Sequence, residues 1–140
     1  MSASQDNTIK VWDIKQIVQG YDEDDEGVQT VNQAMLTVMA HQKFINVAKF
    51  SPNDKFIASA SQDKSIKIWS ARDLQLLQTL TGHRKNVWDI QFSPVEKQLV
   101  SVSGDLLVKV WDLSGNGKCM ATLQGHQDQL VKVQWLNMGL

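Results

Sequence analysis

The feature that most constrains this chain is an internal repeat of about 42 residues. Three histidines, His41, His83 and His126, are spaced 42 and 43 positions apart. Each is followed after four positions by an aliphatic residue and after nine by an aromatic residue, namely Ile45, Val87 and Leu130, then Phe50, Phe92 and Trp135. Self-similarity at a fixed period is typical of a repeat architecture, so one repeat is the unit whose structure must be predicted.

An aspartate and a tryptophan recur at the same interval. The pairs that lie 42 residues apart are Asp63 with Asp105 and Trp69 with Trp111. The N-terminus carries the end of another copy, because residues 3–13 match residues 60–70 at most positions. The chain therefore contains two complete repeats, the end of a preceding repeat and the beginning of a further one.

Each repeat is predicted to form four short strands. Residues 65–69 and 107–111 alternate polar and apolar side chains, which is the period of a half-buried strand. Segments rich in strand-forming residues, separated by tight polar turns, lie at 55–61, 74–80, 98–103 and 118–123. We find no helical periodicity, so the predicted fold class is all-β, with each repeat a four-stranded antiparallel meander.

Composition and charge argue against several classes of protein. The chain has 140 residues, a net charge of −1, 42% hydrophobic and 21% charged residues, which is typical of a folded globular protein. Its apolar runs are far shorter than the roughly 20 residues of a membrane helix, and we expect no secretory signal. Cys119 is the single cysteine, so an internal disulfide is excluded and a structural, partly buried thiol is expected.

Three dipeptides at this period give the chain a family resemblance. They are Gly82-His83 and Gly125-His126, Ser51-Pro52 and Ser93-Pro94, and Trp12-Asp13 and Trp111-Asp112. This combination resembles the WD-repeat (WD40) family of β-propellers. Ala40-His41 and Trp69-Ser70 depart from the pattern, but the period and the other positions hold. The resemblance covers the chain apart from one acidic insertion, and it implies propeller blades.

The repeat boundaries predict an incomplete propeller of about three blades. Complete blades are expected at 41–82 and 83–125. Residues 2–40 are expected to form the end of strand b with strands c and d of a preceding blade. Residues 126–140 are expected to supply strand a, at 129–136, of a further or composite blade. Propellers typically close with four to eight blades, so we expect a piece of a longer protein, or an isolated chain that self-associates head to tail.

The family resemblance implies a hydrogen-bond network inside each blade, running from aspartate to histidine to serine to tryptophan. The matching residues are His41, Ser59, Asp63 and Trp69 in one blade and His83, Ser101, Asp105 and Trp111 in the next. A Ser-His-Asp nucleophile is the alternative interpretation. The recurrence of the set every 42 residues, with a tryptophan at its end, favours a structural role. We therefore expect no catalytic residues, and no metal or cofactor.

An acidic insertion separates the first two repeats. The distance from tryptophan to histidine is 29 residues in this copy but 14 and 15 in the next two. The insertion, residues 15–33, contains the consecutive acids Asp22, Glu23, Asp24, Asp25 and Glu26. We expect a solvated loop, with an acidic docking loop for a basic partner as the alternative. A calcium loop is disfavoured because the acids are consecutive rather than alternating.

Four cations are candidate contacts for a partner. In the layout of the family, Lys43, Lys64, Arg84 and Lys85 lie in or beside the loops of the top face, which carries the histidine and aspartate loops. A phosphate or an acidic segment would meet them first, and simple solvation is the alternative. Trp88 is expected to pack in the core, with a surface anchor as the alternative.

Within the WD-repeat family, residues 40–46, 51–55, 58–63 and 82–94 resemble the transducin-β-like subunits of the small-subunit processome, a nucleolar ribonucleoprotein. The resemblance implies a non-catalytic protein–protein interaction scaffold for pre-rRNA processing and ribosome biogenesis, located in the nucleolus. Its partners would be other proteins of the complex, with at most indirect RNA contact and no membrane. The alternatives are a substrate adaptor of a ubiquitin ligase and a transducin-β-like signalling subunit, which would be cytoplasmic.

Overall fold

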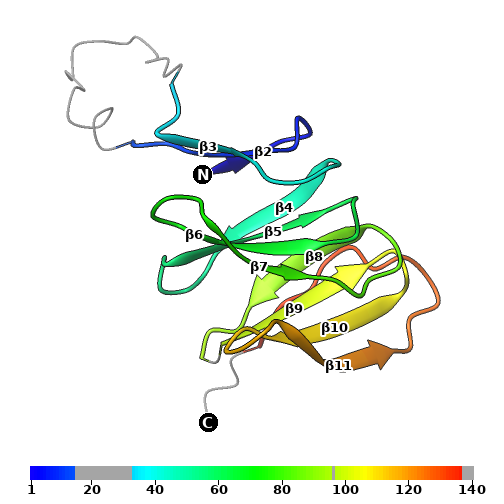
Figure 1. The fold of residues 1–140 in the computed structure, drawn as a ribbon. Helices are drawn as coiled ribbons and strands as arrows, with labels where there is room; N and C mark the ends of the chain where they lie inside the picture. Colours follow the sequence, from blue (N-terminus) through cyan, green and yellow to red (C-terminus); the bar gives the residue numbers. More distant parts are fainter. Residues whose placement is uncertain (15–32, 96, 137–140) are drawn as a thin grey trace, which may run out of the picture.

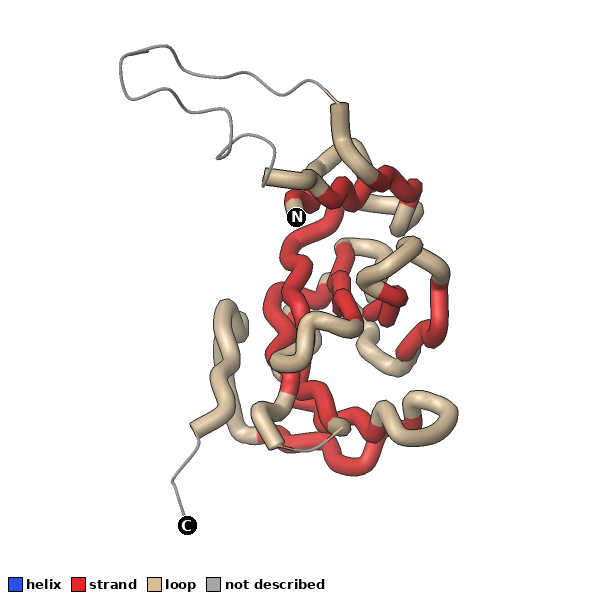
Figure 2. Tube along the Cα trace, turned by 90° about the vertical axis from the view of Figure 1, so that its left-hand side faces the viewer, coloured by secondary structure: helices blue, strands red, loops and turns tan. Residues whose placement is uncertain are grey.

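A computed structural model describes residues 1–14, 33–95 and 97–136, and these residues form strands and no helix. The strands make three antiparallel sheets that follow one another along the chain, from blue to orange in Figure 1. The view in Figure 2 shows the same succession, with the N-terminal sheet at the top. The prediction of an all-β fold of consecutive meanders is confirmed.

The N-terminal sheet has three strands, and each of the two sheets that follow has four. The N-terminal sheet contains β1 (Ser2–Ala3), β2 (Thr8–Val11) and β3 (Leu36–Met39). The second sheet, called blade A, contains β4 (Ile45–Phe50), β5 (Phe56–Ser61), β6 (Ile66–Ser70) and β7 (Leu76–Leu80). The third, called blade B, contains β8 (Val87–Phe92), β9 (Gln98–Ser103), β10 (Leu107–Asp112) and β11 (Lys118–Gln124). Strands pair in chain order within each sheet, which is the topology of a meander.

One turn has the same conformation in all three sheets. It connects β1 to β2, β5 to β6 and β9 to β10, and in each copy the residue after the aspartate adopts a positive φ. These residues are Asn7, Lys64 and Leu106, with φ of 67°, 72° and 69°. In each copy the aspartate Oδ1 accepts a hydrogen bond from the backbone N–H two residues later. An aspartate that bonds its own backbone in this way favours a tight turn.

Apolar side chains from neighbouring sheets form two core clusters. One lies between blades A and B and consists of Ala58, Ala60, Ile66, Ile68, Leu80, Val87, Ile90, Phe92, Leu99 and Trp111. The other joins the N-terminal sheet to blade A and consists of Ile9, Ala40, Ile45, Ile57, Trp69 and Leu74. Because each cluster draws on two sheets, burial of apolar surface holds successive sheets face to face.

Polar contacts also connect the first strands of the two blades. The Asn46 amide Nδ2 donates a hydrogen bond of 2.7 Å to the carbonyl oxygen of Val87. Three residues further along β4, the Lys49 ammonium lies 2.9 Å from a carboxylate oxygen of Asp89, which is buried. Because hydrogen bonds and ion pairs depend on direction, these contacts fix the position of β4 relative to β8 more closely than apolar packing alone.

The C-terminal segment differs from the strand expected at 129–136, because residues 125–136 form no strand. The segment instead runs beside β8: Val133 N donates to Asp89 Oδ2 at 3.1 Å, and Trp135 Nε1 donates to the Gln91 carbonyl at 3.1 Å. A strand requires a ladder partner, and within the described residues no strand forms a backbone ladder with this segment. The segment therefore has the side-chain contacts of a first strand without its backbone pairing.

A second difference concerns the strand expected at 74–80. Leu74 has a φ of 56° and a buried side chain, and β7 begins at Leu76. A positive φ interrupts an extended backbone, so Leu74 belongs to the turn between β6 and β7 rather than to a strand. Its side chain packs in the cluster that joins the N-terminal sheet to blade A. The acidic insertion, apart from Gln33, lies outside the described residues.

Candidate interaction surfaces

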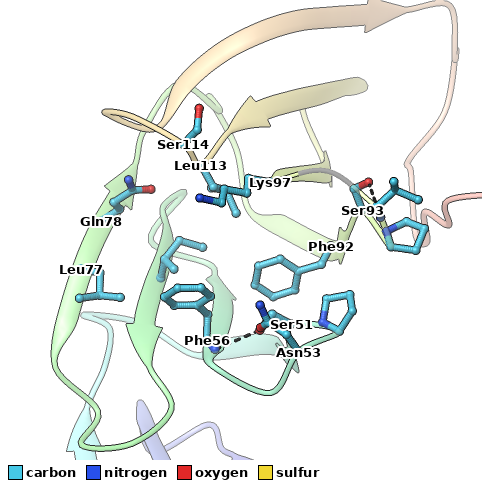
Figure 3. A pocket seen from close by; sticks show the side chains of 14 residues that line it. Ser51, Asn53, Phe56, Leu77, Gln78, Phe92, Ser93, Lys97, Leu113 and Ser114 are labelled. Carbon is cyan, nitrogen blue, oxygen red and sulfur yellow. Dashed lines mark hydrogen bonds between the residues drawn. The ribbon is translucent and has the colours of Figure 1, made fainter.

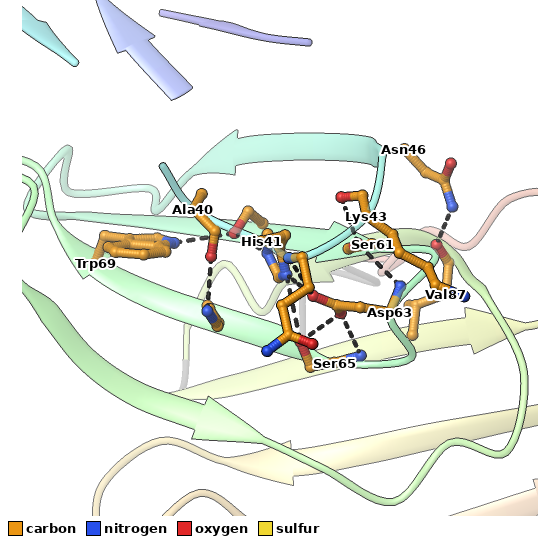
Figure 4. Close-up of polar contacts among 12 residues, drawn as sticks. Ala40, His41, Lys43, Asn46, Ser61, Asp63, Ser65, Trp69 and Val87 are labelled. Atoms are coloured by element: carbon orange, nitrogen blue, oxygen red, sulfur yellow. Dashed lines mark hydrogen bonds and ion pairs between the residues drawn. The ribbon is translucent and has the colours of Figure 1, made fainter. Parts of the chain in front are cut away.

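The four predicted network residues of blade A form one hydrogen-bonded relay (Figure 4). His41 precedes β4, Ser59 lies on β5, Asp63 lies in the following turn and Trp69 lies on β6. His41 Nδ1 is 2.8 Å from Asp63 Oδ2, and His41 Nε2 is 2.7 Å from Ser59 Oγ. Trp69 Nε1 donates to the same Ser59 Oγ at 2.9 Å.

The directions of these hydrogen bonds follow from the groups involved. An ionised aspartate only accepts, so Nδ1 of the neutral imidazole carries the proton and donates it to Asp63. Nε2 is then an acceptor, which receives the Ser59 hydroxyl proton. The Ser59 oxygen in turn accepts from the Trp69 indole, which only donates. Every polar atom of the relay therefore has a partner of the correct kind.

Blade B repeats the relay with nearly the same dimensions. His83 Nδ1 lies 2.9 Å from Asp105 Oδ2, and His83 Nε2 lies 2.8 Å from Ser101 Oγ. Trp111 Nε1 donates to Ser101 Oγ at 2.8 Å. The sequence prediction thus named two sets of four residues that the structure joins by hydrogen bonds.

Burial sets the protonation states in the relays. Burial disfavours the charged imidazolium and lowers the pKa of His41 and His83 below the ordinary histidine value, although the aspartate beside each opposes the shift. Burial acts to raise the pKa of Asp63, but hydrogen bonds from Ser65 and His41 outweigh it and lower the pKa to about 2. Neutral histidine and ionised aspartate are therefore the forms at neutral pH.

The relay geometry does not suit nucleophilic catalysis. Ser59 and Ser101 are both fully buried, and each hydroxyl oxygen is enclosed by an imidazole and an indole. A nucleophile must reach a substrate atom, whereas these hydroxyls reach only the interior of their own blade. The relays therefore connect the strands of a blade.

The structure adds two contacts that the sequence interpretation missed. Trp12 Nε1 donates to Ser2 Oγ at 2.9 Å, which reproduces the serine–tryptophan half of the relay in the N-terminal sheet. The signal was present, since Ser2 precedes Trp12 by ten residues, the spacing in both blades. Lys67 donates from Nζ to the Ala40 carbonyl at 2.6 Å and lies 5.7 Å from the Trp69 ring centroid.

Three of the four predicted top-face cations line one small hollow. The hollow has a volume of about 210 Å³ and is lined by Lys64, Arg84, Lys85, Asn86, Trp88, Gly104 and Gln129; we call it the top-face hollow. Lys43 is exposed and does not line it. Trp88 is half-buried and lines the hollow, although the sequence interpretation favoured core packing.

Trp88 occupies the repeat position of Asn46. The Asn46 side chain donates to the following blade, whereas Trp88 Nε1 is buried and has no acceptor among the described residues. The corresponding carbonyl is that of Leu130, in the C-terminal segment that forms no strand. The indole is therefore held by packing alone.

A larger apolar groove lies between the two blades, on the side of the turns that connect β4 to β5 and β8 to β9 (Figure 3). Its volume is about 590 Å³. The rings of Phe56 and Phe92, with Leu77 and Leu113, supply most of its apolar wall. Gln78 lies at its edge, donates from Nε2 to the Gly115 carbonyl and keeps a buried Oε1 without a donor among the described residues.

Four other features that the sequence raised concern the acidic loop, a metal site, a membrane span and the cysteine. The candidate acidic loop, Asp22, Glu23, Asp24, Asp25 and Glu26, is not among the described residues. Within the described ranges, no three histidine, cysteine or acidic side chains are placed to hold a metal ion. No helix in the described part of the chain has the length and apolarity needed to span a membrane. Cys119 is half-buried, and its sulfur is a free thiol rather than part of a disulfide.

A family model described as "WD domain, G-beta repeat" matches residues 1–13, 32–70 and 74–112. The chain belongs to the WD40 repeat family. Its matched segments contain the N-terminal sheet and both relays, so the repeats defined by sequence correspond to WD40 repeats. WD40 repeats are typically non-catalytic scaffolds, in agreement with the buried serines.

Curated relatives include two proteins that each match about half of the chain. Transducin beta-like protein 3 of Bos taurus is 37% identical over 79 residues, which are 56% of this chain and 10% of that protein. U3 small nucleolar RNA-associated protein 13 of Saccharomyces cerevisiae is 39% identical over 79 residues, 56% of this chain and 9% of that protein. The chain thus spans about a tenth of the length of these relatives.

Solved structures agree with this family. The structure of U3-55K superimposes with a TM-score of 0.75 and 30% identity, covering 91% of this chain and 36% of that one. The crystal structure of the RRP9 WD40 repeats gives a TM-score of 0.74 and 31% identity, with the same coverage. Both likenesses extend over most of the chain.

Proposed function

We propose that this chain is part of a non-catalytic scaffold that holds proteins together in a nucleolar ribonucleoprotein acting in pre-rRNA processing and ribosome biogenesis. The observation that carries the proposal is the agreement of two independent comparisons. A relative found by sequence and a neighbour found by structure both carry U3 in their names. A further relative is ribosome assembly protein 4 of Saccharomyces cerevisiae, 49% identical over 39 residues.

The structure supports the scaffold role through rigidity. Each blade is tied internally by its relay and externally by an apolar cluster shared with its neighbour. Loops carried on such a rigid support can present binding residues in fixed positions. The groove between the blades, with Phe56 and Leu77 partly exposed, is a surface that a protein partner would cover.

The experiment is affinity purification of the tagged protein from its own cells. The proposal predicts enrichment of U3 small nucleolar RNA and of ribosome-assembly proteins over a tag-only control, together with nucleolar localisation by imaging. Recovery of ubiquitin-ligase or receptor components without U3 RNA would instead support an adaptor or signalling function and contradict the proposal.

We also propose that the isolated 140-residue chain pairs head to tail with a second copy. β1 has only two residues and leaves the edge of the N-terminal sheet without a further strand in the described structure. The C-terminal segment, with its side chains beside β8 and its backbone without a ladder, is of a length to pair there. Pairing would cover an edge that otherwise favours aggregation.

A further inference from the structure

The top-face hollow concentrates positive charge from two separate loops. Lys64 belongs to the turn between β5 and β6, whereas Arg84 and Lys85 belong to the loop before β8. None of the three side chains makes an ion pair or hydrogen bond within the described residues. Cations that converge without a counter-ion repel one another, and a bound anion would relieve that repulsion.

Among the described residues, the aspartates of these and the neighbouring loops hydrogen-bond to other groups and form no ion pair with the three cations. Asp63 Oδ2 accepts from His41 and from the backbone N–H of Gln42. Asp105 Oδ2 accepts from His83 and from the backbone N–H of Arg84 in the same manner. Asp128 is exposed, and its Oδ1 accepts from the Gln129 N–H. The cationic side chains thus remain available to a ligand.

Aromatic and amide side chains lie in the same hollow. The Trp88 indole forms part of the wall, beside the amides of Asn86 and Gln129. Gly104 also lines the hollow, and a Cβ added there would lie only 3.2 Å from Trp88 Nε1. A side chain at this position would crowd the indole, so glycine leaves space beside Trp88.

This composition favours one class of ligand. An acidic peptide needs cations alone, whereas single-stranded nucleic acid uses cations for phosphates and aromatic or amide groups for bases. We propose that the top-face hollow binds single-stranded RNA, with Lys64, Arg84 and Lys85 on phosphates and Trp88 against a base. The proposal rests on the proposed function and names the RNA contact within it.

The test is fluorescence anisotropy of a labelled 12-nucleotide oligouridylate with the full chain at several salt concentrations. For single strands, each phosphate contact contributes about 0.7 to the slope of log affinity against log salt. K64Q/K85Q should therefore lower the slope by about 1.4. The matched control K55Q/K118Q removes the same charge from exposed lysines outside the hollow and should leave the slope unchanged.

Trp88 provides a second, independent readout. Loss of one base–aromatic contact corresponds to about a 5- to 150-fold weaker affinity, which is expected for Trp88→Leu. Trp88→Phe keeps an aromatic ring and should bind within a few-fold of the original protein. Circular dichroism checks that each variant is folded, and if Trp88→Leu is not, the lysine pair and Trp88→Phe carry the test.

Three results would overturn the proposal. One is a salt slope for K64Q/K85Q equal to that of K55Q/K118Q, and another is full RNA affinity in folded Trp88→Leu. The third is tighter binding of poly-glutamate than of the oligouridylate at the same salt, independent of Trp88, which would make the hollow an acidic-peptide site. Because this binding is measured without other subunits, its failure is distinguishable from failure to co-purify with U3 RNA.

Discussion

Substitution of Ser101 by alanine removes one hydroxyl that two buried groups share. His83 Nε2 and Trp111 Nε1 each lie 2.8 Å from Ser101 Oγ. Both side chains are buried, with Trp111 only 1% exposed, so water cannot readily replace the hydroxyl. A buried polar group without a partner costs about 1–3 kcal/mol, and two such groups would lower the free energy of unfolding by about 2–6 kcal/mol. This is a large fraction of the roughly 5–15 kcal/mol of a typical domain.

The assay is urea unfolding followed by tryptophan fluorescence and circular dichroism. The control is Ser114→Ala, which removes an exposed hydroxyl that donates to Asp112 Oδ1 and should change stability by less than about 0.5 kcal/mol. Ser59→Ala is the internal replicate, because Ser59 has the same two kinds of partner in blade A. A loss for Ser101→Ala no larger than that for Ser114→Ala would refute the relay as a source of stability.

Four further outcomes are expected. Because burial lowers the pKa of His83, the unfolded chain takes up protons first as the pH falls below about 6.5, so the free energy of unfolding should decline there. A second decline is expected below about 3.8, where Asp63 with its pKa of about 2 stays ionised only in the folded chain; urea midpoints that stay constant from pH 7.5 to 3 would contradict both. Gly82 has a φ of 148°, and a Cβ there would lie 3.3 Å from Trp111, so Gly82→Ala should lower the thermal midpoint. The control Gly125→Ala should leave the midpoint unchanged, because a Cβ there would have no neighbour within 4 Å. Equal midpoints for the two variants would contradict this prediction. Light scattering of the isolated chain should give the mass of two copies, and a folded monomer would exclude head-to-tail pairing.

The blades and their relays were predictable because the repeat places the same residues at the same interval. Asp63 and Trp69 recur 42 residues later as Asp105 and Trp111. These residues could therefore be matched without knowing where each strand begins or ends. The repeat even contained a contact that was overlooked, since Ser2 stands ten residues before Trp12. The repeat therefore identified the residues of both relays, and the family resemblance implied how they are joined by hydrogen bonds.

Features that depend on neighbouring sheets were not predictable in this way. The segment at 129–136 has the sequence of a first strand, but backbone pairing requires a second strand beside it. Trp88 was assigned to the core, yet it is half-buried and lines the top-face hollow, and its indole N–H has no acceptor among the described residues. Leu74 shows the same limit locally, because its apolar side chain suggested a strand while its φ of 56° places it in a turn.

The proton positions in the two relays test the account most directly. Nitrogen-15 chemical shifts of the imidazole rings distinguish a proton on Nδ1 from one on Nε2. With Asp63 and Asp105 accepting at Nδ1, both His41 and His83 should be neutral at pH 7, with the proton on Nδ1 and a bare Nε2 that accepts from serine. A proton on Nε2 in either ring, or titration at the ordinary histidine pKa, would contradict the account.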